Sequence, residues 1–269
     1  MTAGLAGTLF FSGCGEQKAT SAAASSAASE QVFNVGTRGT SKPYTYVDDN
    51  GKLTGYDIEI LREIEKRNPG IHFEFKPMAL NAAYVAMDAG QIDLIANQMT
   101  KTPAREEKYI FPKELNNYSV RKLVVKEGRT DIHSLDDLKG KTVAISSPSE
   151  FHILVDEFNQ TADPKINIVY VDKGPAETLN LVATGRVDAA GEYEYITKIA
   201  REDRHLPVEP VGPVLKVIPT YFLLKKGPQY QKLADTIDKT LKEMKADGTL
   251  KKLSEKFLMG DYTVEPKNS

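Results

Sequence analysis

From residue 32 onward, apolar residues recur with two alternating spacings. Over residues 56–67 the spacing is that of an amphipathic helix, because Tyr56, Ile60 and Ile64 share one face, and Asn68-Pro69-Gly70 then ends it. Shorter apolar runs predict strands. We expect strands over residues 32–37, 72–76, 92–96, 123–125, 142–145, 166–171 and 187–190, and helices over 81–89, 134–138, 150–158, 178–183 and most of the C-terminal part. This alternation predicts an α/β fold in which helices connect parallel strands.

Two segments resemble each other. Residues 87–93 (MDAGQID) and 182–188 (VATGRVD) each read as a helix end, a glycine, a polar residue and a strand that opens with Ile-Asp or Val-Asp. Glycine suits the left-handed exit of a helix. The pattern is explained either by two similar lobes or by the general chemistry of helix-to-strand turns.

Composition excludes several classes of protein. The 269 residues are 41% hydrophobic and 27% charged, and 35 basic against 37 acidic residues give a net charge of −2, which argues against nucleic acid as the main partner. No apolar run reaches the roughly 20 residues of a membrane span. The single cysteine and the scattered histidines give no metal motif, so we expect neither a metal nor another cofactor.

The N-terminus reads as a targeting segment. Residues 3–11 are almost all small or apolar, and the Ser-Gly-Cys ending at Cys14 resembles a bacterial lipobox, although Phe11 replaces the usual leucine and no Lys or Arg comes before. The alternative is a buried free cysteine. We expect a signal peptide over 1–13 and an Ala/Ser-rich lipidated tether over 14–31. This organisation predicts an extracytoplasmic protein, lipid-anchored to the cell membrane of a Gram-positive bacterium.

Six segments, in the same order, resemble the family 3 solute-binding proteins, the receptors of polar amino-acid ABC importers. They are 43–46 (PYTY), 55–60 (GYDIEI), 90–95 (GQIDLI) leading into 99–105 (MTKTPAR), 111–112 (FP), 137–143 (DLKGKTV) and 185–189 (GRVDA). The resemblance implies a type II periplasmic-binding-protein-like fold, with two α/β lobes joined by two hinge crossover strands. Lobe 1 would span 32–119 and 220–269, and lobe 2 would span 123–216. It also implies a monomer that binds a free amino acid between the lobes and delivers it to a membrane permease.

The resemblance assigns the ligand's α-carboxylate to Arg105, since arginine binds a carboxylate through two parallel hydrogen bonds. The alternative is a surface salt bridge from Arg105 to Glu106 or Asp93. The carbonyls and side chains of the nearby loop are expected to serve the ligand's ammonium and carboxylate. These loop residues are Asn97, Gln98 and Thr100.

Lobe 2 is expected to contribute Ser149 and Glu150, because amide groups at a helix N-terminus bind anions. An ordinary N-cap at Ser149 is the alternative. The family's ammonium-binding aspartate aligns with Tyr193, and we favour the neighbouring Glu192 for this role. Alternatively, Glu192 and Glu194 start a solvated helix.

Specificity rests on the loop that follows the first strand, where we expect Ser41 and Tyr44 to contact ligand. Arg38 resembles the arginine that reads a distal carboxylate in glutamate/aspartate receptors, whereas residues 96–99 (ANQM) resemble cystine receptors. Cystine or an acidic amino acid is therefore the expected ligand. The alternative is that Arg38 pairs with Asp57 or Asp188 and never meets ligand.

Two other functions fit the same resemblance. Cyclohexadienyl dehydratases share the fold and would need a positioned acid such as Glu192. An extracellular sensor domain would need a transmembrane segment beyond the domain. The tethered organisation favours a receptor over both, so we expect a protein without enzymatic activity.

Overall fold

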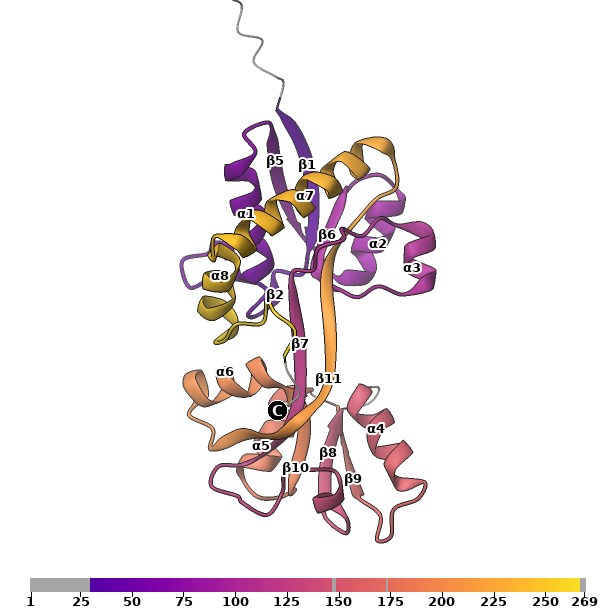
Figure 1. Ribbon diagram of the computed structural model, residues 1–269, viewed down its shortest axis with the longest axis vertical. Helices are drawn as coiled ribbons and strands as arrows, with labels where there is room; N and C mark the ends of the chain where they lie inside the picture. The colour runs from indigo at the N-terminus through magenta and orange to yellow at the C-terminus, as the bar shows by residue number, and fades with distance from the viewer. Residues whose placement is uncertain (1–29, 147–148, 173, 267–269) are drawn as a thin grey trace, which may run out of the picture.

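The computed structural model describes residues 30–146, 149–172 and 174–266. It has two lobes, joined by the long strands β7 (Asn117–Lys126) and β11 (Val208–Leu224), as Figure 1 shows. The strands form one hydrogen-bonded order, β5-β1-β6-β11-β7-β10-β8-β9, because β11 pairs with β6 through its C-terminal end and with β7 along most of its length. The expected two-lobe α/β fold is confirmed.

Lobe 1 contains the parallel strands β1 (Gln31–Thr37), β5 (Ile71–Pro77) and β6 (Leu94–Met99). A small sheet of β2 (Thr40–Ser41), β3 (Thr45–Val47) and β4 (Leu53–Thr54) follows β1. The helices of this lobe are α1 (Tyr56–Arg67), α2 (Leu80–Asp88), α3 (Pro103–Lys108), α7 (Pro228–Ala246) and α8 (Thr249–Leu258). The apolar faces of α1, α7 and α8 pack together in one buried cluster with residues of β1 and β6.

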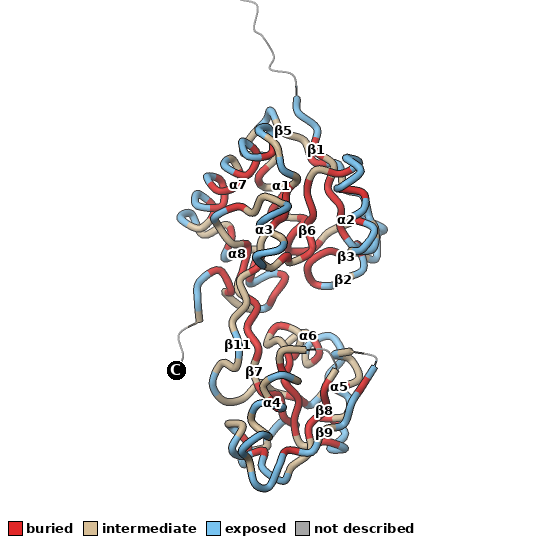
Figure 2. Tube along the Cα trace, turned by 90° about the vertical axis from the view of Figure 1, so that its right-hand side faces the viewer, coloured by how far each residue is buried: buried red, intermediate tan, exposed pale blue. Residues whose placement is uncertain are grey.

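Lobe 2 contains the parallel strands β8 (Thr142–Ser146), β9 (Asn167–Val171) and β10 (Ala189–Tyr193), with β7 antiparallel to β10. Its helices are η1 (Asp136–Leu138), α4 (Glu150–Asn159), α5 (Pro175–Ala183) and α6 (Glu194–Arg204). Figure 2 shows buried residues inside each lobe, with exposed residues around each periphery. Each lobe thus has its own apolar interior, which allows the two to move as units.

The two similar segments have the same local structure. Each glycine leaves its helix at a φ of 72°. The Asp93 carboxylate accepts a hydrogen bond from the Asn34 amide at 2.8 Å, and the Asp188 carboxylate accepts one from the Thr142 amide at 2.7 Å. Each aspartate therefore ties the end of its turn to a strand of its own lobe, and the sequence similarity reflects a repeated structural device.

Several boundaries differ from the sequence-based expectation. Gln31, expected in the tether, begins β1. The strand predicted over 187–190 lies at Ala189–Tyr193, so Glu192 is in a strand and only Glu194 begins the helix. The short helix expected over 134–138 is a 3-10 turn at Asp136–Leu138. Cys14, the signal peptide and nearly all of the tether lie outside the described residues, as does part of the loop before α4.

No helix within the described ranges is long and apolar enough to cross a membrane. Over the same residues, no group of three or more His, Cys, Asp or Glu side chains has the arrangement of a metal site.

Candidate functional site

The candidate site residues follow the carboxyl ends of strands in both lobes. Arg38 follows β1, and Thr100 follows β6. Ser149 lies between β8 and α4, and Glu192 lies near the end of β10. In open α/β sheets, ligands bind outside the carboxyl ends of the strands. In Figure 1 these ends of the two lobes face each other, and β7 and β11 run from one lobe to the other between them.

Arg105 lies on α3, whose N-cap Thr102 accepts a hydrogen bond from the Arg105 amide at 3.3 Å. One guanidinium nitrogen of Arg105, Nη1, donates to the carbonyl and hydroxyl oxygens of Thr100, both at 2.9 Å. No ion pair to Glu106 or Asp93 forms among the described residues. Thr100 thus orients the guanidinium, and Nε and Nη2 make no hydrogen bond within the described part of the chain.

Asn97 and Gln98 lie within β6, which continues further than expected. The Asn97 side-chain oxygen accepts from the Arg38 amide at 2.9 Å, and this links the ends of β1 and β6. Gln98 has a φ of 48°, in the left-handed region. Its side chain and its backbone amide both donate to Asp57, at 2.8 and 3.2 Å. The Gln98 side chain is therefore directed at a buried carboxylate of lobe 1.

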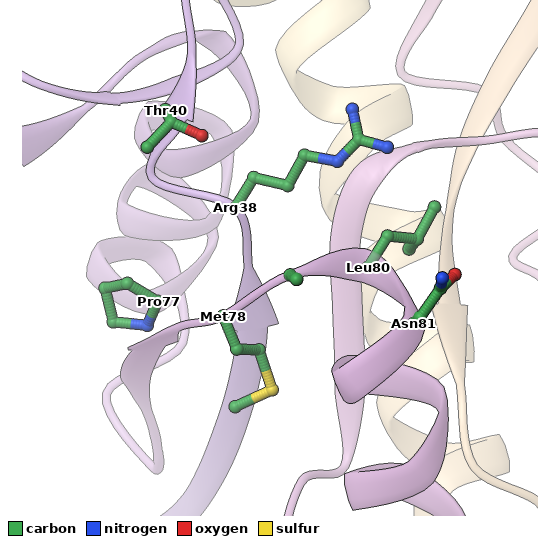
Figure 3. A pocket seen from close by; sticks show the side chains of 7 residues that line it. Arg38, Thr40, Pro77, Met78, Leu80 and Asn81 are labelled. Carbon is green, nitrogen blue, oxygen red and sulfur yellow. The ribbon is translucent and has the colours of Figure 1, made fainter.

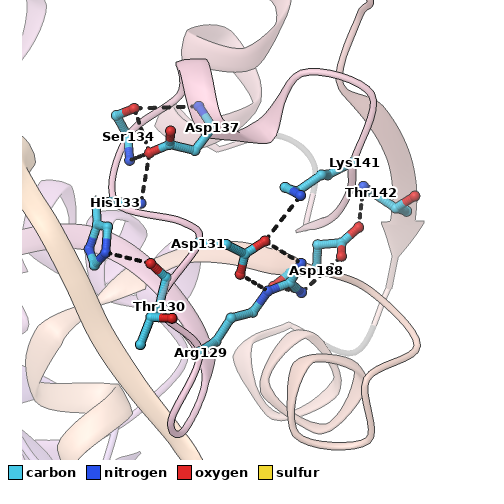
Figure 4. A network of polar contacts seen from close by, with 9 residues as sticks. All are labelled: Arg129, Thr130, Asp131, His133, Ser134, Asp137, Lys141, Thr142 and Asp188. Atoms are coloured by element: carbon cyan, nitrogen blue, oxygen red, sulfur yellow. Dashed lines mark hydrogen bonds and ion pairs between the residues drawn. The ribbon is translucent and has the colours of Figure 1, made fainter.

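Arg38 has an exposed side chain and pairs with neither of the aspartates named as its alternative partners. Asp57 accepts from Gln98, and Asp188 pairs with Arg129 at 2.8 Å in a polar network of lobe 2 that Figure 4 shows. Arg38 instead lines a cavity of about 570 Å³ beside the N-terminal end of α2. The other lining residues are Thr40, Pro77, Met78, Ala79, Leu80 and Asn81, most of which are labelled in Figure 3.

Tyr44 and Ser41 are engaged with the protein itself. Ser41 is half-buried in β2, and its carbonyl accepts from the Tyr44 amide at 2.9 Å. The buried Tyr44 hydroxyl accepts a hydrogen bond from the Asn117 side-chain nitrogen at 3.1 Å and lies 3.4 Å from the Ser119 hydroxyl, and both partners are on β7. Burial raises the pKa of Tyr44 above its usual value. The Tyr44 hydroxyl is thus anchored on a strand that joins the lobes.

In lobe 2, Ser149 caps α4, because its hydroxyl accepts from the His152 amide at 3.2 Å. Glu192 is buried, and its carboxylate accepts from the Thr178 hydroxyl at 2.7 Å. Burial raises the pKa of Glu192, and the hydrogen bond from Thr178 and the charge of Arg121 oppose that effect. Ser149, Glu192 and Tyr193 line a cavity of about 180 Å³.

Arg121 also lines this cavity and was not among the predicted site residues. It lies on β7, and its guanidinium donates to the Gly191 carbonyl at 2.6 Å and sits 4.2 Å from the centroid of the Tyr193 ring. A second nitrogen lies 3.4 Å from the Glu150 carboxylate. The available signal was a pair of cations, Arg121 and Lys122, placed directly before the apolar run at 123–125. Arg121 thus lies beside the Glu150 carboxylate, and its charge also acts to lower the pKa of Glu192.

The chain matches the family model of the bacterial extracellular solute-binding proteins, family 3, over residues 33–260. It is 36% identical over 234 residues to the L-cystine-binding protein TcyJ of Bacillus subtilis, covering 87% of this chain and 86% of that protein. The Neisseria gonorrhoeae L-cystine solute receptor, in its unliganded open conformation, superposes with a TM-score of 0.74 at 30% identity and covers 87% of this chain and 95% of that one. The probable amino-acid ABC transporter extracellular-binding protein ytmK of Bacillus subtilis superposes with a TM-score of 0.78 at 34% identity. The match covers 87% of this chain and 100% of that one.

The fold and the facing strand ends define a two-lobe solute-binding protein. The chain belongs to the bacterial extracellular solute-binding proteins of family 3. Relatives in this family are binding proteins of amino-acid ABC transporters, as the sequence resemblance predicted.

Proposed function

We propose that this protein captures one free amino acid between its two lobes and delivers it to the permease of an ABC importer. The observation that carries the proposal is Arg105, which Thr100 orients and whose Nε and Nη2 make no hydrogen bond within the described part of the chain. A guanidinium with two free donors binds a carboxylate through paired hydrogen bonds. Glu192 is the proposed partner of the ligand ammonium, and its burial strengthens such an interaction.

The other proposed contacts come from both lobes. Asn97, Gln98 and Thr100 would offer backbone groups from lobe 1, and Ser41 and Tyr44 would border the ligand on that side. Ser149, Glu150 and Tyr193 would close over it from lobe 2.

We propose cystine or an acidic amino acid as the ligand. Arg38 supports this choice, because its exposed guanidinium has no ion-pair partner among the described residues and lines a cavity large enough for a further polar group. TcyJ of Bacillus subtilis is named for L-cystine, which carries a second carboxylate, and this agrees with a cation at that place.

We further propose the organisation expected from the sequence. Cys14 would carry a lipid, residues 14–30 would tether the receptor to the outer face of a Gram-positive cell membrane, and the monomer would divide into lobe 1 (31–119 and 220–269) and lobe 2 (123–216). The compared relatives are binding proteins, which favours binding over dehydratase chemistry.

A thermal-shift screen over the amino acids tests the proposal. A ligand that binds only the folded state raises the melting temperature with concentration. We expect L-cystine, L-glutamate or L-aspartate to give the largest shift, and small-angle scattering with that ligand to show compaction. An unchanged melting temperature with every amino acid would contradict the proposed function.

A further inference from the structure

The carboxylate of Asp57 is fully buried at the start of α1, yet it does not cap that helix. Its Oδ2 accepts both Gln98 donors, the amide at 3.2 Å and the side-chain nitrogen at 2.8 Å. Its Oδ1 is buried with no hydrogen-bond partner among the described residues. A buried carboxylate with one unpaired oxygen costs folding free energy. Stabilisation of the fold therefore does not explain why an aspartate is buried at position 57.

Gln98 needs such a partner, because its φ of 48° is unfavourable for a residue with a side chain. Asn97, directly before it, and Thr100, two positions after it, connect to the two arginines of the candidate site. Asn97 accepts from the Arg38 amide, and Thr100 accepts twice from the Arg105 guanidinium. A change in the Gln98 conformation would thus move the groups that orient both arginines.

We propose that Asp57 is a positioning residue for the amino-acid site: from inside lobe 1 it fixes Gln98, and through Gln98 the segment 97–100, in the conformation that binds ligand. The inference rests on the proposed function. It also gives the aspartate of the segment 55–60 a role that does not require contact with ligand.

The charge of Asp57 can be changed directly by changing the pH. Burial raises the pKa of Asp57 to about 6, while its hydrogen bonds from Gln98 and, to a smaller extent, the nearby Asn116 side chain oppose that shift. The titratable groups packed around it are Tyr44 and Tyr56, and burial raises the pKa of both hydroxyls, so neither ionises near neutral pH. Lowering the pH from 7.5 to 5 therefore neutralises Asp57 and weakens its hold on Gln98.

The first test is Asp57→Asn, which keeps the shape and removes the charge. The probe is whichever of L-cystine, L-glutamate and L-glutamine binds the wild type most tightly. Loss of charge-assisted hydrogen bonds should weaken its affinity roughly tenfold to a hundredfold. The melting temperature at pH 7.5 should stay level or rise, because a buried charge has gone. An affinity within about threefold of the wild type, or a loss accompanied by a fall of more than about 4 °C, would overturn the inference.

The second test is a rescue. Glycine adopts positive φ without strain, so Gln98→Gly reduces the need for an anchor. Asp57→Asn should therefore cost less affinity in the Gln98→Gly background than in the wild type. Equal costs in the two backgrounds would show that Asp57 does not act through Gln98.

The third test uses the ligand-free protein and remains readable if a variant folds poorly. In the wild type, the NMR signal of the Gln98 amide proton should titrate with a midpoint near pH 6, the pKa expected for Asp57. Glu192→Gln serves as the control, because the pKa of Glu192 is also raised but this residue lies in lobe 2. The Gln98 signal of this variant should therefore titrate with the same midpoint as in the wild type. A Gln98 signal that does not change between pH 7.5 and 5 overturns the inference.

Different results would contradict the proposed function and the inference about Asp57. If the wild type and Asp57→Asn bind the same amino acid equally well, the proposed function stands and the inference about Asp57 falls. If the wild type binds no amino acid, the proposed function falls, and the positioning role falls with it.

Discussion

Tyr44 of lobe 1 and Tyr195 of lobe 2 meet edge to face, with ring centroids 5.2 Å apart and planes at 90°. Tyr195 is buried among apolar residues of lobe 1 although it lies on α6. A second link between the lobes is the exposed ion pair of Lys42 and Asp203, at 2.6 Å. Because aromatic burial outweighs an exposed ion pair, the tyrosine pair is the stronger link.

Tyr195→Ala should therefore lower the free energy of unfolding by about 3–5 kcal/mol, the usual cost of deleting a buried aromatic ring. Lys42→Ala should change it by about 1 kcal/mol or less. Denaturant titrations of both variants provide the comparison, with Tyr195→Phe as a control that keeps the ring. Equal effects of Tyr195→Ala and Lys42→Ala would show that the ring contact contributes little.

Gly55 illustrates why a glycine stands at the start of α1. It has a φ of 121°, and a Cβ there would lie 2.3 Å from the Tyr44 carbonyl oxygen. That carbonyl accepts from the Asp57 amide at 3.1 Å, so the close approach joins α1 to the loop before it. Gly55→Ala should cost about 2–5 kcal/mol, from strain and overlap together.

Gly51 is the matched control for Gly55, because its φ of 77° is also positive while a Cβ there would meet nothing within 4 Å. Gly51→Ala should cost only about 1–2 kcal/mol. Thermal unfolding of the two variants separates the contributions. If Gly51→Ala were as harmful as Gly55→Ala, backbone strain alone would account for the effect.

Glu192 should make stability depend on pH. Its pKa is raised in the folded protein, mainly by burial, so the folded state binds the proton more tightly than the unfolded state. The Glu192 contribution to stability therefore increases as the pH falls from neutral. Glu192→Gln should unfold at a higher denaturant concentration than the wild type at pH 7.5, and the difference should shrink at pH 5.

The control for this prediction is Glu202→Gln, on the exposed part of α6, which should show no such trend. Under the proposed function, Glu192→Gln should also bind the amino acid more weakly while folding more stably. A variant that is less stable at pH 7.5 would mean that the ionised carboxylate stabilises the empty protein.

Arg38 should determine which amino acids bind. Removing one partner of a desolvated charge pair costs about 2–5 kcal/mol. Arg38→Ala should weaken L-cystine and L-glutamate by roughly thirtyfold to several-thousandfold and spare L-glutamine. Competition binding with the three ligands gives the ratio directly. Equal weakening of L-glutamate and L-glutamine would make Arg38 a structural residue and remove the case for an anionic side-chain pocket.

The sequence predicted those elements whose signals are local. The bounds of α1 match the prediction, because its apolar face is regular and Gly55 and Pro69 mark its ends. The long strand β11 was not among the strands predicted from local pattern, and the resemblance implied only a crossover between lobe 2 and the second part of lobe 1. Prolines at 210, 213 and 219 break its pattern, and its length comes from pairing with β7 and β6 instead of from local propensity.

A sequence motif singled out Arg105, whose ligand-binding role stays a prediction, but no motif singled out the residues whose contacts depend on burial. The charged residue Arg121 stands in a strand of ordinary composition, and only folding places it beside Glu150 and over Tyr193. Likewise, no local pattern shows that Gln98 turns toward Asp57, because these residues are 41 positions apart. Contacts of this kind depend on tertiary structure.

Isothermal titration calorimetry of the wild type and Arg105→Ala tests the central claim most directly. The wild type should bind L-cystine or an acidic amino acid at one site, and Arg105→Ala should weaken every amino-acid ligand by roughly thirtyfold to several-thousandfold, because all of them carry the α-carboxylate. Arg201→Ala, which removes a surface arginine paired with Glu127 at 2.8 Å, should bind like the wild type. Wild-type affinity in Arg105→Ala would contradict the account.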